Sequence, residues 1–421
     1  MTSLGNRYSA PRLAYLSFDV VPAPKGAATH IQAFSECLYQ GFGALELVTI
    51  APQGLETHLE ARPHFIHHQL PVQGKTLIDR VMDFRHQLHR WQQGRRFDII
   101  QIRSIYEGFP IAQSKDKWCN SLIFEVNGLP SIELKYRYPR VAQDRELLHK
   151  LTTQEQICFE AADLIITPSP VTEAYLIGRG VPPEKVRVIA NGVCLDNFTY
   201  HAPSCEPELT LFKLLYFGTV SAWQGVAIAL EALALYRRDF EATLTIIAPT
   251  RPQQRYQLEK MVTRLDLNES VHFLDPLPQG ELVEQIHQAD AVVAPLTAND
   301  RNLVQGCCPL KVLESMATGT PVISTNLPVV QALAGETVPF LAVRPGSAKA
   351  VKDAMLQLRN NPQRRLELAQ AARDRIETAY TWTHAGQALI EVYRNLLDCP
   401  KVGSTRPEVL DILGSENNPT R

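Results

Sequence analysis

Short apolar runs alternate with longer amphipathic segments along most of the chain. The apolar runs are typical of strands buried in a parallel sheet. The segments between them carry apolar residues at the three- and four-residue spacing of helices. The pattern therefore predicts an α/β fold in which strands and helices alternate.

The predicted strands form two series, one in each half of the chain. The first series lies at residues 12–18, 45–50, 64–70, 97–102, 122–126, 163–167 and 186–189. The second lies at residues 213–217, 243–248, 271–274, 291–295 and 339–343, with a further strand beginning near residue 322. Helices are expected at residues 27–40, 77–93, 144–161, 279–288, 347–360, 362–378 and 382–397.

A break in the periodicity separates the two series. Residues 201–208, HAPSCEPE, hold two prolines and no repeat of apolar positions. A chain of 421 residues is also too long for one ordinary core. Two domains are therefore predicted, at residues 1–200 and 209–378. Residues 400–421 are short on apolar periodicity and are expected to be disordered.

Composition and charge narrow the class of protein. The net charge of −2 and the pI near 6.6 give no electrostatic reason to expect a nucleic-acid partner. No apolar run reaches the ~18 residues that a membrane-spanning helix needs, and the N-terminus lacks the pattern of a secretion signal. The eight cysteines show no C-x2-C spacing, which favours a reducing cytoplasm and no structural zinc.

The most informative stretch is residues 306–323, which reads as a loop, a short helix, a glycine turn and a buried strand. Pro309 suits the first helical turn, and Gly319 suits a position after the helix that needs a positive φ. The free N–H groups at the start of this helix would suit a phosphate, with Lys311 close by. Glu314, one turn further along, could accept hydrogen bonds from sugar hydroxyls. An ordinary sheet-packing helix with a solvated polar stripe is the alternative interpretation.

Other candidate residues follow predicted strands. Gly26 lies in a loop between the first strand and the first helix, and His30, one turn into that helix, is expected at the surface or as a capping residue. Arg103 and Tyr106 follow the carboxyl end of a strand, where ligands gather in open parallel sheets. Residues 133–140, ELKYRYPR, are expected to form a loop beside a cleft. The basic side chains of that loop could meet an anionic acceptor, or the loop could simply be solvated.

The run from Pro309, ending LESMATGTPVIST, resembles the signature of family-4 glycosyltransferases of the GT-B type, which have two Rossmann-like domains facing each other across a cleft. In that family the helix carries a Glu-x7-Glu pair. Glu314 falls on the second Glu, which holds the nucleotide ribose. Gly306 falls on the first, which holds the donor sugar.

Further matches and departures follow from the same resemblance. Gly26-Ala27 matches a pair that contacts the donor diphosphate, and Asn191-Gly192-Val193 resembles the hinge between the domains. The helix at residues 379–398 is expected to cross back onto the first domain. Gln224 stands where the family commonly has a lysine, and Asn127 stands near where it usually has a histidine. Asn127 cannot carry a proton at neutral pH.

The loop at residues 297–305 precedes the helix that begins at Pro309 and could compensate for these losses. Arg301 and Asn302 lie in it, and arginine can bind phosphate in bidentate fashion. A polar surface loop is the alternative. If nothing compensates, the chain would bind a nucleotide sugar without turning it over, as a non-catalytic subunit of a partner protein.

The resemblance implies transfer of a sugar from a UDP- or GDP-hexose to a hydroxyl with retention of configuration. No cofactor or metal is expected, because the helix dipole and basic side chains would stabilise the leaving diphosphate and the chain has no D-x-D motif. The acceptor would be a cell-surface polysaccharide or lipid-linked glycan, or else a sugar phosphate as in sucrose-phosphate synthesis. A sugar-nucleotide epimerase is a third alternative. A cytoplasmic location is expected, with peripheral membrane contact left open.

The resemblance and the pattern together assign three groups of residues. The expected catalytic residues are Asn127, Arg301 and Lys311. The expected donor-binding residues are Gly26, Ala27, Gly218, Gln224, Arg251, Asn302, Gln305, Gly306, Cys307, Cys308 and Glu314. The expected acceptor-side residues are Arg103, Tyr106, Lys135 and Arg137.

Overall fold

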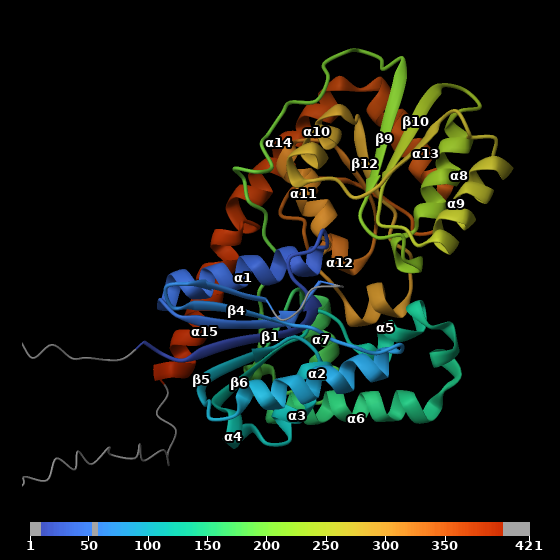
Figure 1. The fold of residues 1–421 in the computed structure, drawn as a ribbon. Coiled ribbons are helices and arrows are strands. Elements are labelled where there is room, and N and C mark those ends of the chain that lie inside the picture. Colours follow the sequence, from blue (N-terminus) through green and yellow to red (C-terminus); the bar gives the residue numbers. More distant parts are fainter. Residues whose placement is uncertain (1–9, 53–57, 399–421) are drawn as a thin grey trace, which may run out of the picture.

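The computed structural model describes residues 10–52 and 58–398 of the chain. It has two lobes, each built on a sheet with helices on both faces, and one lobe lies above the other in Figure 1. The alternation of strands and helices that the apolar pattern predicts is confirmed. The expected tail, at residues 400–421, lies outside the described residues.

The N-terminal sheet has eight strands in the order β3-β4-β2-β1-β5-β6-β7-β8, and all neighbours are parallel except β3 and β4. The strands are β1 (Leu13–Val20), β2 (Leu45–Ile50), β3 (His58–Arg62), β4 (Phe65–Leu70), β5 (Phe97–Ile102), β6 (Cys119–Glu125), β7 (Leu164–Thr167) and β8 (Val186–Val188). Sequence analysis missed β3, an edge strand that turns tightly into β4 through His64, whose φ is 63°. Its helices are α1 (Gly26–Phe42), α2 (Leu77–Gln92), α3 (Ile105–Ala112), α4 (Lys115–Trp118), α5 (Pro130–Arg137), α6 (Arg145–Ala161) and α7 (Pro170–Gly178), with 3-10 turns η1 (Pro139–Gln143) and η2 (Pro183–Lys185).

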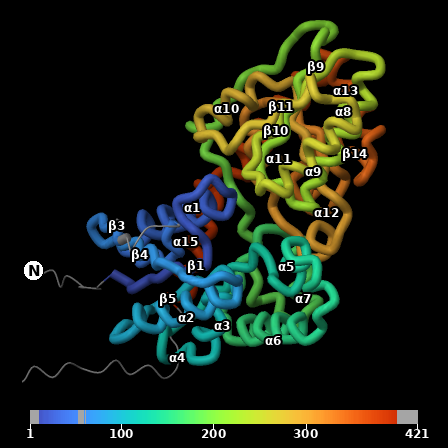
Figure 2. The backbone as a smooth tube through the Cα atoms, turned by 45° about the vertical axis from the view of Figure 1, so that its right-hand side comes forward, coloured from blue at the N-terminus to red at the C-terminus, as the bar shows by residue number. Residues whose placement is uncertain are grey.

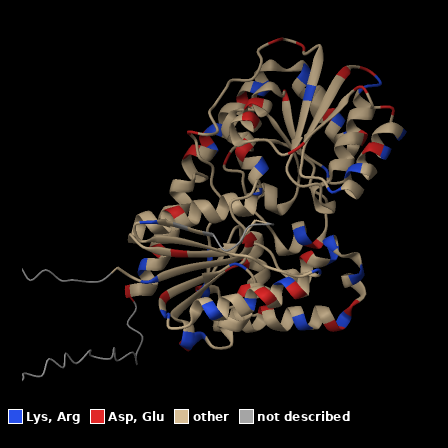
Figure 3. Ribbon diagram, viewed as in Figure 1, with Lys and Arg blue, Asp and Glu red and all other residues tan. Residues whose placement is uncertain are grey.

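The C-terminal sheet has six parallel strands in the order β11-β10-β9-β12-β13-β14. They are β9 (Leu211–Phe217), β10 (Glu241–Ile247), β11 (Val271–Leu274), β12 (Ala291–Ala294), β13 (Val322–Thr325) and β14 (Leu341–Val343). The helices are α8 (Val226–Tyr236), α9 (Pro252–Arg264), α10 (Gln279–Gln288), α11 (Leu310–Thr318), α12 (Pro328–Gln331), α13 (Ala348–Asn360) and α14 (Pro362–Ala379), with a 3-10 turn η3 (Ala222–Gln224) and a π-helical turn η4 (Arg301–Gln305). Lys/Arg and Asp/Glu are interspersed over both lobes (Figure 3).

Three local expectations are wrong. Residues 133–140 form the end of α5 and the turn η1, because Pro130 starts a helix and Pro130 and Ile132 are buried. The loop at residues 297–305 ends in the π-helical turn η4. The polar stripe of α11 is not solvated. Lys311, Ser315 and Thr318 are buried, and the two hydroxyls donate to carbonyls of their own helix.

The chain crosses between the lobes twice, and the two crossings touch. Residues 189–193 lead into the C-terminal lobe, and α15 (Trp382–Asp398) returns to pack on α1 (Figures 1 and 2). Val193 N donates to Tyr380 O at 2.8 Å. A Cβ on Gly192 would lie 2.3 Å from the nitrogen of Trp382, so only glycine allows this approach.

Gly192→Ala is therefore expected to destabilise the protein. The neighbouring atoms are backbone atoms, which cannot rotate away, so the added methyl group is expected to lower the free energy of unfolding by about 1–3 kcal/mol. Each kcal/mol lowers the unfolding midpoint by about 2–4 °C. Thermal unfolding followed by circular dichroism measures it. Gly280→Ala is the control, because no atom lies within 4 Å of its added Cβ. Equal midpoints for the two variants would contradict the close approach.

Candidate active site

A cavity of about 1170 Å³ lies between the lobes. Both β1 and β6 end at it on one side, and β9 and β12 end at it on the other. Carboxyl ends of parallel strands are the usual place for ligands in such sheets. The cavity is therefore the candidate active site.

The start of α11 forms one wall of this cavity. Pro309 is the residue before the helix and not in its first turn as expected, whereas Gly319 follows the helix with a φ of 81°, as predicted. The side chain of Lys311 is buried, and its Nζ lies 3.9 Å from the centre of the Tyr216 ring without a hydrogen-bond partner among the described residues. Burial lowers the pKa of Lys311 to about 7, against a weaker opposing effect of Glu314.

Glu314 lies one turn further along α11 and lines the same cavity. Burial raises the pKa of Glu314 to about 7, and the nearby Lys311 partly offsets that rise. Lys311 and Glu314 thus form a cation and a carboxyl on one helix face, both with a pKa near 7. Such perturbed pKa values are typical of sites that bind a charged or hydroxylated ligand.

The turn η4 connects this wall to the opposite lobe. Arg301 lines the cavity, with its Nε 3.1 Å from Glu133 Oε1 of α5 and its guanidinium over the Trp223 ring. Gln305 is buried and donates to the same Glu133 oxygen at 2.8 Å, while its Oε1 accepts from Leu129 N. Arg301 and Gln305 therefore both join the two lobes through Glu133, and Arg301 also borders the cavity.

Asn302 and Gly306 have structural roles, because Asn302 binds backbone carbonyls and Gly306 allows a close approach of the two lobes. Asn302 Nδ2 donates to the carbonyls of Trp223 and Thr297. Gly306 has a φ of 85°, and an added Cβ would lie 2.7 Å from Thr172 Oγ1 and 2.8 Å from Thr172 N on α7. The position of the family's first Glu is thus packed against the other lobe, with no room for a side chain of any kind.

Most of the expected site residues meet at the cavity. Its lining includes Gly26, Ala27, Arg103, Tyr106, Asn127, Arg137, Gly218, Gln224, Arg301, Asn302, Cys307, Cys308, Lys311 and Glu314. Four expected residues do not line it, namely Lys135, Arg251, Gln305 and Gly306. Lys135 forms an ion pair with Asp300 across the lobes. Arg251 is exposed at the start of α9.

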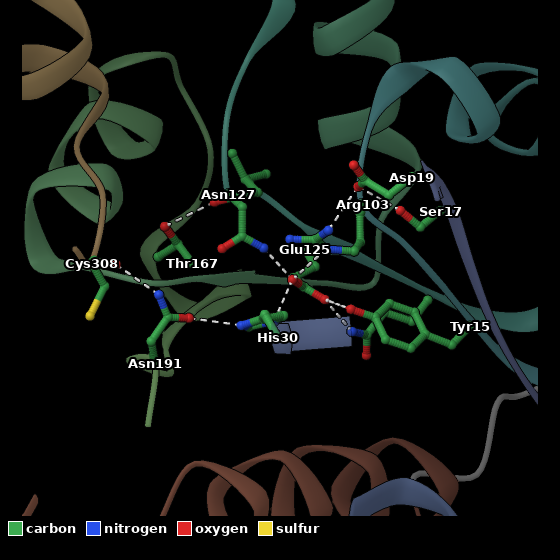
Figure 4. Close-up of polar contacts among 12 residues, drawn as sticks. Tyr15, Ser17, Asp19, His30, Arg103, Glu125, Asn127, Thr167, Asn191 and Cys308 are labelled. Atoms are coloured by element: carbon green, nitrogen blue, oxygen red, sulfur yellow. Dashed lines mark hydrogen bonds and ion pairs between the residues drawn. The ribbon is translucent and has the colours of Figure 1, made fainter. Parts of the chain in front are cut away.

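A buried carboxylate, Glu125, organises the opposite wall (Figure 4). It lies at the end of β6 and accepts hydrogen bonds from Tyr15 at 2.6 Å, Gln101 at 2.6 Å and Arg103 at 2.9 Å, and from Asn127. Burial favours its neutral acid, but the charges of His30 and Arg103 and these hydrogen bonds hold the pKa of Glu125 well below its usual range.

These contacts change the expected role of two residues. Arg103 binds Glu125 and also Asp19, at 3.0 Å, so its charge is neutralised within the protein and it is not a free cation for an acceptor. Asn127 donates to Glu125, which leaves its carbonyl oxygen to face the cavity.

His30 is neither at the surface nor a capping residue, contrary to expectation. Its side chain is 4% exposed, and its Nε2 lies 2.7 Å from Glu125 Oε1. Its Nδ1 lies 2.7 Å from Asn191 Oδ1, and Asn191 Nδ2 donates to Cys308 O at 2.7 Å. Sequence reasoning missed this group. The available signal was a charged residue, Glu125, at the end of an apolar strand two positions before Asn127.

Unpaired cations also line the N-terminal wall. Lys25, Arg80 and Arg137 border the cavity, and none of them forms an ion pair with another described residue.

Among residues 10–52 and 58–398, no helix is long and apolar enough to cross a membrane. The same part of the chain contains no cluster of three or more His, Cys, Asp or Glu side chains that could hold a metal ion.

Two family models match the chain, one for each lobe. Residues 24–197 match the model described as Glycosyltransferase Family 4, and residues 205–375 match that described as Glycosyl transferases group 1. A D-inositol 3-phosphate glycosyltransferase of Corynebacterium urealyticum is 25% identical over 349 residues, which cover 80% of this chain and 79% of the relative. The amylovoran biosynthesis glycosyltransferase AmsK of Erwinia amylovora is 25% identical over 242 residues, covering 56% and 58%.

Solved structures show the same architecture. Sucrose-phosphate synthase from Thermosynechococcus elongatus has a TM-score of 0.74 and 21% identity, with 92% of this chain and 99% of that chain covered. HepE from Anabaena, in complex with UDP and glucose, has a TM-score of 0.68 and 18% identity, with 91% and 100% covered. The fold is therefore GT-B, as predicted. The chain belongs to the group 1 and family 4 glycosyltransferases and is a glycosyltransferase of glycan or polysaccharide biosynthesis.

Proposed function

We propose that the enzyme transfers a hexose from a UDP- or GDP-sugar to a hydroxyl of a glycan, with retention of configuration and without a metal. One observation carries the proposal. The Lys311 ammonium is buried at the start of α11 without a hydrogen-bond partner among residues 10–52 and 58–398, and Glu314 lies one turn away in the same cavity. An unpaired buried cation is costly, and the charge of a diphosphate would offset that cost.

In this proposal the donor diphosphate lies against the amino end of α11. The N–H groups at Cys307 and Cys308, the helix dipole and Lys311 would stabilise its charge. Lys311 then supplies the cation that Gln224 lacks. Arg301 would also bind the diphosphate, which requires its ion pair with Glu133 to loosen. Glu314 would accept hydrogen bonds from the ribose.

For a retaining enzyme, the opposite wall favours a reaction on one face of the sugar over a double displacement. A double displacement would need a free carboxylate near the anomeric carbon. Glu125 is surrounded by five donors or cations, so it is poorly placed to act as that nucleophile. In the proposed step the bond from the anomeric carbon to the phosphate oxygen breaks and the bond to the acceptor oxygen forms on the same face. The acceptor proton passes to the departing phosphate oxygen.

A sugar phosphate is the second candidate acceptor. The cations Lys25, Arg80 and Arg137 border the N-terminal side of the cavity and could pair with a phosphate. The relatives named for D-inositol 3-phosphate and sucrose-phosphate synthesis make this class worth testing beside polysaccharide acceptors.

Glu314→Gln is expected to weaken nucleotide-sugar binding by at least tenfold, because an amide is a weaker acceptor for ribose hydroxyls than a carboxylate. Thermal shift with UDP-, GDP- and ADP-glucose identifies the donor, since bound ligand raises the unfolding midpoint, and calorimetry then measures affinity. Glu284→Gln, on the exposed face of α10, is the control. Unchanged affinity in Glu314→Gln would remove the ribose assignment, and the absence of any binding or sugar transfer by the wild type would contradict the proposed function.

Nucleotide-sugar affinity is expected to peak near pH 7. Above that pH Lys311 is neutral in the free enzyme and must take up a proton to meet the diphosphate, so affinity falls by up to tenfold per pH unit. Below it Glu314 is protonated and must lose a proton to accept from the ribose, so affinity falls again. A nucleotide sugar is the right probe, because free UDP has a phosphate that itself titrates near pH 6.

Lys311→Arg separates the two limbs of this profile. A guanidinium stays charged, so the alkaline loss of affinity should disappear while the acid limb persists. Lys311→Met should bind at least tenfold more weakly near pH 7. Calorimetric titrations between pH 5.5 and 9 measure both variants. An alkaline limb that survives in Lys311→Arg would show that another group causes it.

A further inference from the structure

One side chain, His30, lies where both crossings between the lobes meet. It projects from α1 and packs on Phe34, with ring centres 4.0 Å apart, and edge-on against Trp382, at 5.7 Å. Trp382 begins the returning helix α15, and Asn191 belongs to the outgoing crossing. The ring therefore touches the chain on its way into the C-terminal lobe and on its way back.

The hydrogen bonds of His30 run from one lobe to the other (Figure 4). Asn191 Nδ2 donates to Cys308 O, so Asn191 Oδ1 is the atom that faces His30. An amide oxygen only accepts, so Nδ1 of His30 donates to Asn191 Oδ1. Nε2 of the same ring faces Glu125 Oε1 at 2.7 Å. The path thus connects a carboxylate of the N-terminal sheet to a backbone carbonyl beside Pro309.

The two ends of this path lie in the two halves of the proposed site. Glu125 also holds Asn127 and Arg103 on the acceptor wall. Cys308 lies in the segment just before α11, against which the donor diphosphate is proposed to lie. Every side chain between them is buried, so water does not compete for these bonds.

We propose that His30 and Asn191 are positioning residues for sugar transfer. They hold the donor-binding end of α11 at a set distance and angle from the acceptor wall. The inference rests on the proposed function, because a transfer reaction needs the anomeric carbon and the acceptor oxygen to be aligned across the cleft. A misplacement of about 1 Å in such an alignment can cost about 100-fold in rate.

Two substitutions of His30 separate its two contacts. The amide nitrogen of asparagine takes the place of Nδ1, so His30→Asn can keep the bond to Asn191 while it loses Glu125. The amide nitrogen of glutamine takes the place of Nε2, so His30→Gln can keep Glu125 while it loses Asn191. His30 and Glu125 belong to the same lobe, so transfer by His30→Asn, which loses only that contact, is expected within about fivefold of wild type in kcat. His30→Gln breaks the contact that leads through Asn191 to the other lobe and should lose about 100-fold. Donor affinity should change less than threefold in both, because Lys311 and Glu314 are untouched.

Asn191→Asp tests the other end of the path. An aspartate can still accept from His30, but it cannot donate to Cys308 O and sets a negative oxygen against that carbonyl. Its kcat is expected to fall about 100-fold, a larger loss than the loss of donor affinity that the new negative charge beside Cys308 causes. Asn326→Asp is the matched control, because this exposed asparagine accepts from Gln331 through an oxygen that aspartate retains.

The outcomes are separable. If wild type transfers sugar but His30→Asn and His30→Gln have equal kcat, or if Asn191→Asp matches Asn326→Asp, the positioning role is wrong and the proposed function stands. Lower unfolding midpoints with unchanged kcat would mean that His30 is an ordinary core histidine. If His30→Gln does not fold, the comparison of Asn191→Asp with Asn326→Asp decides. No transfer by wild type with any donor would count against the proposed function itself.

Discussion

The site depends on the burial of Lys311, whose ammonium has no hydrogen-bond partner in the part of the chain that the structure describes. The burial of Lys311 is imposed by α11, whose apolar side chains Val312, Leu313 and Met316 are fully buried in the core of the C-terminal lobe. The helix cannot rotate to expose the lysine without exposing those side chains. The free energy cost of burying this cation is therefore imposed by the fold, and a bound anion would relieve it.

The two walls of the cavity differ in how far their polar groups are satisfied. On the N-terminal wall Glu125 is surrounded by donors and cations, and Arg103 lies between two carboxylates. Such a saturated network is rigid, because moving any member breaks several bonds. On the C-terminal wall Lys311 and the Gln224 side-chain oxygen have no hydrogen-bond partner among the described residues. We infer that the N-terminal wall positions the reacting groups and that the C-terminal wall binds the donor.

The structure shows the surroundings of one departure from the family motif. At Gly306, where the resemblance places a sugar-binding glutamate, the backbone packs on Thr172 of the other lobe at a distance that excludes a Cβ. The same stretch holds Gln305 and Arg301 against Glu133 of α5. The segment before α11 is thus a contact between the two lobes, whereas Lys311, on the helix itself, lines the cavity without a hydrogen-bond partner among the described residues.

The sequence by itself determined the alternation of strands and helices along the chain and the bounds of α11, because apolar periodicity and the Pro309-to-Gly319 helix signals are local. The GT-B fold was indicated by the resemblance to family-4 glycosyltransferases. The sequence also placed most of the lining residues, since carboxyl ends of parallel strands converge. Only the tertiary structure decided which polar groups are free. His30, Glu125 and Asn191 come from distant parts of the chain but lie in contact in the folded protein. Arg103 forms ion pairs with Glu125 and Asp19 and is therefore not the free cation that the sequence predicts. Burial and pairing depend on neighbours that no local pattern specifies, so the division between structural and ligand-binding charges appears only when the chain is folded.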